Sequence, residues 1–187
     1  MQTFSIMLDS ECYTSKPTTR DASAITKRLQ RSGPTEVTAD ELACAIRQGR
    51  AWMAGMFAPS DKGWGAFRGV RLWALDCDNH EGDRQLTPSD DGFIWPENIR
   101  QRLVSLGFKP LLCHSTAHAS KDKIRFRTIF DIGETVTDEA EAREVVALVL
   151  KHFPECDQSC KNTNRLFFGA AKCGIYPYSA GAEVWPS

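Results

Sequence analysis

The feature that most constrains the fold of this chain is an apolar run, residues 72–75, that leads directly into two aspartates. Such a run predicts a buried strand, and side chains at positions i and i+2 of a strand point the same way, about 6 to 7 Å apart. Asp76 and Asp78 are therefore expected to project together from the end of a core strand. Paired carboxylates in this position suit one or two divalent cations that face a phosphate substrate. The alternative is a plain turn with a solvated Asn79, a residue type that turns favour.

The composition indicates one globular domain. Of 187 residues, 42% are apolar and 25% are charged, and the seven cysteines are scattered along the chain. No apolar run approaches the length of about 20 residues that a membrane-spanning helix needs. Residues 1–9 lack the basic start and apolar stretch of a signal peptide. We therefore expect a cytoplasmic protein with no membrane partner, in which the cysteines are buried thiols.

Charge is unevenly distributed along the chain. The net charge of −1 provides no overall attraction to nucleic acid. However, residues 16–31 and 121–127 are rich in lysine and arginine, whereas residues 134–144 are acidic. Local basic patches can bind phosphates even when the whole protein is neutral. For the first patch, a solvated face is the simpler interpretation.

The spacing of apolar residues and turn formers predicts an α+β or α/β domain around a mixed sheet. Thr38 and Glu41 form a capping box at the start of one helix, and Pro96 opens another. Two of the strands are separated by a polar turn and are expected to form a hairpin. Helices are predicted over residues 21–30, 39–47, 96–106 and 137–152, and strands over residues 3–7, 51–57, 72–76, 110–115, 123–131 and 166–168.

Polar residues gather at three further points along the chain. The simplest interpretation of each is structural: a hydrogen-bonded histidine, a solvated sheet face and a turn. Together with Asp76 and Asp78, however, they form a chemically coherent set, because arginine forks suit phosphate oxygens and three carboxylates can hold two metal ions. The three groups are Ser115, Thr116 and His118; Lys123, Arg125 and Arg127; and Asp157, Asn162, Asn164 and Arg165.

These groups, in this order, resemble the motifs of a known family. The segment LWALDCDN (residues 72–79) resembles the first motif of the archaeo-eukaryotic primase superfamily, in the primase-polymerase branch found in phages, plasmids and integrated elements. STAH (115–118) with KIRFRTIF (123–130) is similar to the second motif, and DQSCKNTNRLFFG (157–169) to the third. The resemblance covers residues 37–170. The second motif usually has a small residue two places before its histidine, which is Thr116 here, with Ser115 one place earlier.

The resemblance implies an α+β catalytic core with a mixed or antiparallel sheet and an RRM-like half flanked by helices. We expect a single catalytic domain over residues 1–187: an N-terminal segment (1–36), the motif-bearing core (37–170) and a tail (171–187). The helicase or helix-bundle regions that often follow this core are missing. The chain is therefore expected to be either the core of a longer protein or a short stand-alone member.

The resemblance also implies a function, a DNA primase-polymerase in DNA replication that transfers nucleotides from dNTPs or NTPs to a 3′-hydroxyl. The partners would be a single-stranded DNA template with its primer, the nucleotide and a helicase, in a bacterial cell or encoded by a phage or plasmid. Asp76, Asp78 and Asp157 would bind two Mg²⁺ or Mn²⁺ ions. The residues that would contact the incoming nucleotide are Ser115, Thr116, His118, Arg125, Arg127 and Arg165.

Three alternatives remain open from the sequence. One is a zinc-binding nucleic-acid module, although its spacing departs from the usual C-x2-C pairing, so zinc is less favoured than Mg²⁺ or Mn²⁺; its ligands would be His152, Cys156, Cys160 and Cys173. Another is a metal-dependent nuclease that uses the same carboxylates with His118 or His80 as its base. The third is a non-catalytic binding protein.

Overall fold

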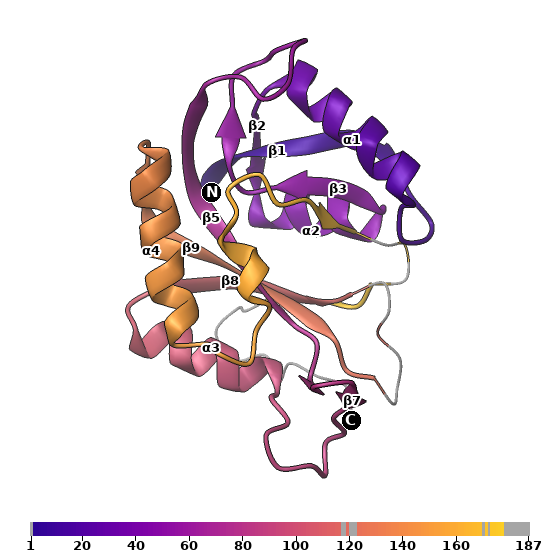
Figure 1. The fold of residues 1–187 in the computed structure, drawn as a ribbon, viewed down its shortest axis with the longest axis vertical. Helices are drawn as coiled ribbons and strands as arrows, with labels where there is room; N and C mark the ends of the chain where they lie inside the picture. The colour runs from indigo at the N-terminus through magenta and orange to yellow at the C-terminus, as the bar shows by residue number, and fades with distance from the viewer. Residues whose placement is uncertain (1, 117–118, 120–122, 170, 172, 178–187) are drawn as a thin grey trace.

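Two main antiparallel sheets and four α-helices make up the computed structural model, which describes residues 2–116, 119, 123–169, 171 and 173–177 (Figure 1). The smaller sheet has the strand order β10-β3-β1-β2, the larger sheet has the order β11-β8-β9-β5-β4, and β6 pairs with β7 alone. The strands are β1 (Thr3–Cys12), β2 (Thr35–Thr38), β3 (Arg50–Met53), β4 (Met56–Phe57), β5 (Phe67–Cys77), β6 (His80–Glu81), β7 (Arg84–Gln85), β8 (Lys109–Ser115), β9 (Phe126–Val136), β10 (Phe167–Phe168) and β11 (Ile175–Pro177). The helices are α1 (Thr19–Ser32), α2 (Ala39–Arg47), α3 (Pro96–Ser105) and α4 (Glu139–Lys151), with a 3₁₀-helix η1 (Gln158–Lys161).

Strand β1 of the smaller sheet contributes side chains to two hydrophobic clusters, one on each face of the sheet. Met7 in β1 packs with Ile25 and Leu29 of α1 in one cluster. Its neighbours Ile6 and Leu8 point to the opposite face and join the main core. Side chains of successive strand residues point to opposite faces, so an apolar run can fill both cores at once.

The larger sheet forms the main core and carries the predicted buried strand. Residues 72–75 in β5 are at most 1% exposed, and β5 pairs with β9 along most of its length. Helix α3 packs on β8 and β9, and α4 packs on β5 and β9 (Figure 1). The expected hairpin of β8 and β9 is also present. Strand β5 packs against α4 and also contacts β1 of the smaller sheet, and burial on both faces explains why this part of the sequence is continuously apolar.

Helix starts follow the local sequence closely. Helix α2 begins after Thr38, with the predicted capping box to Glu41, and α3 begins at Pro96 as predicted. Helix α1, however, is capped by Thr18, with Asp21 as the reciprocal partner, and not by Asp21 itself. Helix α4 is capped by Asp138 one residue after the predicted position. In both cases two residues within one helical turn can each serve as a cap, which leaves the boundary ambiguous from sequence.

Four strand predictions were wrong in extent. The strand predicted over residues 51–57 is divided into β3 and β4, which lie in different sheets, and the strand predicted over residues 72–76 begins at Phe67. Strand β9 begins at Phe126 and not at position 123, and β1 runs on to Cys12. The loop predicted over residues 81–92 contains the short hairpin of β6 and β7. A two-residue strand has too few side chains to show alternation, so its pattern cannot be recognised in sequence.

The prediction that the cysteines are all buried thiols was also wrong. Cys77 and Cys156 form a disulfide, and Cys12 and Cys44 are exposed. Cys113, Cys160 and Cys173 are buried. No described helix is both long enough and apolar enough to cross a membrane.

Candidate active site

A row of three polar side chains crosses the larger sheet where β5 ends. Asp76 in β5 lies opposite Arg127 in β9, and Arg127 lies opposite His114 in β8. Directly opposed residues share one face of a sheet, so the three side chains lie next to one another. Arg127 and His114 are buried, and Asp76 is largely so. A charged row in the core of a sheet is costly unless its members are paired, which singles out this face as a functional candidate.

The third predicted carboxylate, Asp157, reaches this row through a backbone contact. Its N–H donates to the carbonyl of Asp76 at 2.8 Å, which fixes the loop after α4 against the end of β5. The Asp157 carboxylate also caps η1 by accepting from the N–H of Ser159 at 2.8 Å. The disulfide of Cys77 and Cys156 joins the same two segments on the core side, one residue from each carboxylate.

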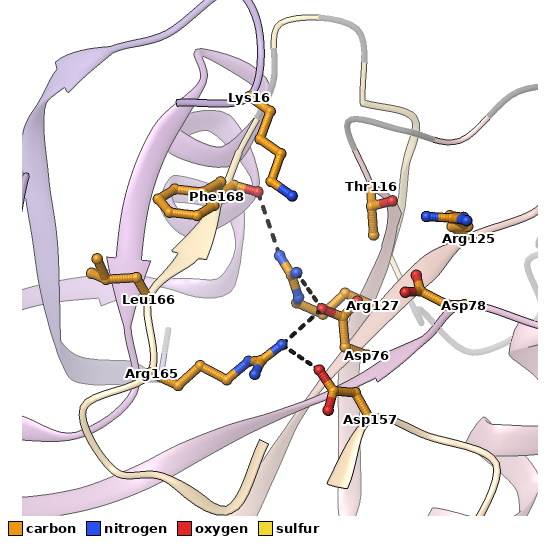
Figure 2. Close-up of a pocket in the computed structure, with 10 residues that line it drawn as sticks. All are labelled: Lys16, Asp76, Asp78, Thr116, Arg125, Arg127, Asp157, Arg165, Leu166 and Phe168. Carbon is orange, nitrogen blue, oxygen red and sulfur yellow. Dashed lines mark hydrogen bonds and ion pairs between the residues drawn. The ribbon is translucent and has the colours of Figure 1, made fainter. Parts of the chain in front are cut away.

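Together these segments enclose a cavity of about 280 Å³ (Figure 2). Its wall comes from β5, β9, the end of β8, the segment between η1 and β10, and the loop before α1. Among the described residues that line it, four are basic and three are acidic. The lining residues are Lys16, Asp76, Asp78, Thr116, Arg125, Arg127, Asp157, Arg165, Leu166 and Phe168.

Two arginines neutralise the carboxylates in the cavity. Arg127 Nη2 lies 2.7 Å from Asp76 Oδ2. Arg165 Nη2 lies 2.6 Å from Asp157 Oδ2 and 3.6 Å from Asp76 Oδ2, so its guanidinium group reaches both acids (Figure 2). Asp76 Oδ1 is nevertheless buried without a hydrogen-bond partner among the described residues, as are the Nε atoms of both arginines. The charges are balanced, but the hydrogen bonds are incomplete.

The surroundings keep these groups ionised. Burial alone would raise the pKa of Asp157, but hydrogen bonds from Ser159 and the charge of Arg165 outweigh it, and the pKa is lowered. Burial would lower the pKa of Arg165, but the acidic groups around it, among them Asp157 and Asp76, raise it. Asp157 and Arg165 are therefore held in their charged forms in the cavity.

His114 is held neutral under this face. Burial lowers its pKa to about 3, and the positive charge of Arg127 acts in the same direction. His114 Nδ1 lies 2.9 Å from the carbonyl oxygen of Ser115, which can only accept a hydrogen bond. The neutral ring therefore carries its proton on Nδ1 and leaves an unprotonated Nε2 buried in the row.

The short hairpin of β6 and β7 holds the outer part of the site. Gln85 Nε2 donates to the carbonyl of Asp78 at 3.0 Å, and Gln85 Oε1 accepts from Arg125 Nε at 3.3 Å. Asn79 is not a solvated turn residue: it is buried, has a φ of 51°, and donates to the carbonyls of Ile94 and Ile124. The turn is therefore built into the core, and it fixes the backbone next to Asp78.

The structure brings together most of the residues that the sequence singled out. All three aspartates line the cavity, together with Thr116, Arg125, Arg127 and Arg165. Ser115 does not line it, because its hydroxyl accepts from the N–H of Gly174 at 2.8 Å and holds the segment before β11. His118 lies outside the described residues. The expected common face of Lys123, Arg125 and Arg127 is only partly formed, because β9 begins after Arg125.

Sequence reasoning missed three cavity residues, Lys16, Leu166 and Phe168. Lys16 belongs to the basic stretch of residues 16–31, for which a solvated face was the simpler interpretation, so it was not singled out as a site residue. The other two belong to the segment RLFFG (residues 165–169) at the end of the third motif. Gly169 ends this run for a steric reason, since a Cβ there would lie 2.4 Å from the carbonyl oxygen of Ile46.

The carboxylates do not form a closed metal site in this arrangement. Among the residues that the structure describes, no three His, Cys, Asp or Glu side chains are grouped to hold one ion. At the predicted Mg²⁺ or Mn²⁺ site, the guanidinium of Arg165 contacts Asp76 and Asp157 together. For the alternative zinc site, Cys156 is bonded to Cys77 and His152 is exposed, while Cys160 and Cys173 are buried.

Comparison with known proteins adds no family to this description. No family model matches the chain, and searches of curated proteins and of solved structures find no match. The argument for function therefore rests on the cavity and on the residues that line it.

Proposed function

We propose that this chain is a primase-polymerase that adds nucleotides from dNTPs or NTPs to a 3′-hydroxyl on a single-stranded DNA template. One observation carries the proposal: residues from three separate parts of the sequence, each resembling one family motif, line the same cavity. They are Asp76 and Asp78; Thr116, Arg125 and Arg127; and Asp157 and Arg165. The finer fold assignment, a core like that of the archaeo-eukaryotic primases, rests on this same convergence.

The donor set fits two Mg²⁺ or Mn²⁺ ions. Carboxylate oxygens are the ligands that these hard cations prefer, and three carboxylates line one wall. Asp76 Oδ1 is buried without a hydrogen-bond partner in the described structure, an arrangement that favours a cation at this oxygen. Bound ions would lower the pKa of the 3′-hydroxyl and neutralise the triphosphate and the leaving pyrophosphate.

The basic side chains suit a triphosphate. Arg125, Arg127, Arg165 and Lys16 line the cavity opposite or between the carboxylates. Guanidinium groups bind phosphate oxygens through two parallel hydrogen bonds, and a protected cavity strengthens these contacts. Their role in the reaction is to orient the nucleotide and to stabilise charge that develops on the phosphate oxygens. Nucleotide and single-stranded DNA substrates would place this activity in the cytoplasm.

A primer-extension assay tests the proposal. A labelled primer on a single-stranded DNA template is incubated with Mn²⁺ and either dNTPs or NTPs, and we expect products that follow the template. Asp78→Ala and Asp76→Ala should lower the rate by about 10³-fold or more, since each removes a metal ligand. Asp91→Ala is the matched control, because this exposed aspartate follows the hairpin and does not line the cavity.

The same assay separates the competing functions. Shortening of the DNA would indicate a nuclease; its second candidate base, His80, is exposed and contacts Arg125. Unchanged extension by both aspartate variants would overturn the proposal. Absence of any nucleotide incorporation by the wild type would favour a non-catalytic binding protein.

A further inference from the structure

Arg165 occupies the position in the cavity where positive charge is most needed. Its Nη2 atom lies within 2.6 Å of Asp157 Oδ2 and within 3.6 Å of Asp76 Oδ2. Two carboxylates that converge in a partly buried site repel each other unless a cation lies between them. In this structure that cation is a guanidinium group of the chain itself, and it contacts oxygens that a divalent ion would need (Figure 2).

The contacts of Arg165 balance charge without locking the side chain. One Nη atom provides both carboxylate contacts, the other Nη contacts the hydroxyl of Ser159, and Nε is buried without a partner in the described structure. A bidentate fork to one carboxylate would be the stronger arrangement. Arg165 is therefore held by charge, and another anion with suitable oxygens can compete for it.

Arg127 differs from Arg165 in its position in the fold and in its exposure. Arg127 lies within β9, its side chain is 8% exposed, and its guanidinium carbon lies 4.6 Å from the centre of the Phe167 ring. Arg165 lies in the turn before β10, its side chain is 24% exposed, and its distance to the same ring is 5.7 Å. The sheet fixes Arg127, whereas Arg165 has the exposure and the chain position that a moving group needs.

We propose that Arg165 is an exchangeable counter-cation, which holds the Asp76 and Asp157 carboxylates until metal arrives and then transfers to the triphosphate of the nucleotide. The inference rests on the proposed function and specifies how its site is regulated. Metal alone must compete with the guanidinium for the same two carboxylates, because Arg165 contacts one oxygen of each. Triphosphate alone must draw the guanidinium away from two carboxylates, which leaves Asp157 without its arginine partner and Asp76 with Arg127 alone. Each ligand removes the obstacle to the other, so the two bind cooperatively, with equal coupling in both directions.

The decisive measurement is Mn²⁺ binding by electron paramagnetic resonance without nucleotide. In Arg165→Met the competing cation is gone, and we expect Mn²⁺ to bind about 10-fold more tightly than in the wild type, within the usual range of coupling between ligands. Primer extension by the same variant should fall, because a phosphate contact is lost. Tighter metal binding with lower activity distinguishes exchange from a simple loss of structure.

Arg143→Met is the matched control for charge. Arg143 pairs with Glu139 on α4 and does not line the cavity, so its loss should leave the affinity for Mn²⁺ unchanged. Thermal unfolding checks that each variant is folded. If Arg165→Met does not fold, Arg165→Lys replaces it; this variant retains the charge but loses the fork, and we expect an affinity between wild type and Met.

The outcomes separate the two proposals. If Arg165→Met, or Arg165→Lys in its place, binds Mn²⁺ with wild-type or lower affinity, the exchange is overturned, even when Asp76→Ala abolishes both Mn²⁺ binding and extension. If Asp76→Ala extends primers at the wild-type rate, the proposed function fails first. Mn²⁺ binding that is tighter in Arg165→Met and absent in Asp76→Ala, together with slower extension by Arg165→Met, supports the exchange.

Discussion

The two ends of the β5–β9 strand pair each carry an Arg–Asp pair, but the pairs differ in how completely they are hydrogen-bonded. At one end, Arg71 makes a fork to Asp131, with Nε to Oδ1 at 3.0 Å and Nη2 to Oδ2 at 3.2 Å. Asp131 also accepts from the side chain of Gln2 and the N–H of Gly133. At the cavity end, Arg127 reaches Asp76 through a single oxygen, and Asp76 Oδ1 has no hydrogen-bond partner in the described structure.

This difference separates a structural ion pair from one that is available to a ligand. Buried carboxylates normally accept several hydrogen bonds, and an unmade bond costs free energy. The Asp131 pair satisfies this rule and ties the start of β5 to β9. The Asp76 pair violates it in a cavity that holds two further carboxylates, where a cation can supply the missing partner. Incomplete hydrogen bonding at a buried charge is therefore a more informative sign of function than the presence of an Arg–Asp pair.

The largest expected effect distinguishes the two Arg–Asp pairs by the same substitution, Asp→Asn, at each end of the strand pair. Asp76→Asn should lower the rate of primer extension by about 10³-fold or more, because a neutral amide is a poor metal ligand. Asp131→Asn should leave the rate per folded molecule unchanged and lower the free energy of unfolding by about 3 kcal/mol, because Arg71 loses its partner. Extension kinetics and urea unfolding measure the two effects. Loss of activity without loss of stability in Asp131→Asn would break the comparison.

The disulfide gives the next effect, since it fastens the cavity end. Cys77 and Cys156 are separated by 79 residues, and a crosslink over a loop of this size is worth about 2 to 4 kcal/mol. Cys77→Ser, or reduction of the wild type, should lower the free energy of unfolding by this amount. Cys12→Ser is the control, because Cys12 is exposed and not crosslinked. Urea unfolding with and without reductant measures the effect, and equal midpoints would contradict the prediction.

A third effect, small at any one pH near neutrality, concerns the neutral His114 beside Arg127. Its pKa is lowered to about 3 in the folded protein, whereas in the unfolded chain it is close to the ordinary value of about 6.5. The unfolded state therefore binds the extra proton, and stability is lost as the pH falls from 6.5 towards 3, by about 1.4 kcal/mol per pH unit at most. His114→Asn should flatten this slope in urea unfolding at several pH values. His152→Asn, at the exposed end of α4, is the control; the same flattening there would argue against His114.

The parts of the fold that were predicted correctly depend on neighbours in the sequence. The capping box of Thr38 and Glu41 involves residues three apart, and Pro96 favours a helix start by its own geometry. The buried strand at residues 72–75 is indicated by its continuous apolar composition. Each of these signals depends on residues that are close together in the sequence, so it can be recognised without knowledge of the tertiary structure.

The site was only partly predictable for the same reason. Asp76 and Asp78 are two residues apart, so strand geometry placed them together, and the family resemblance suggested Asp157 as their partner. No pattern could show that Gln85 in an unpredicted hairpin holds Arg125, or that Lys16 lies in the cavity wall. Asn79 was considered as a solvated turn residue, yet its side chain bonds to backbone groups 15 and 45 residues away.

The amino-acid sequence alone defines the chemical groups of the site and the local segments that carry them. These segments are the buried strand that ends in carboxylates, the basic segment of residues 123–127 and the segment from Asp157 to Arg165. The tertiary structure decided their pairing. It brought Asp157 to Asp76 through a backbone hydrogen bond, and it placed the guanidinium of Arg165 between the two carboxylates. The physical reason is that composition and periodicity act along the chain, whereas the balance of charge in a cavity depends on groups that only folding brings within a few ångströms.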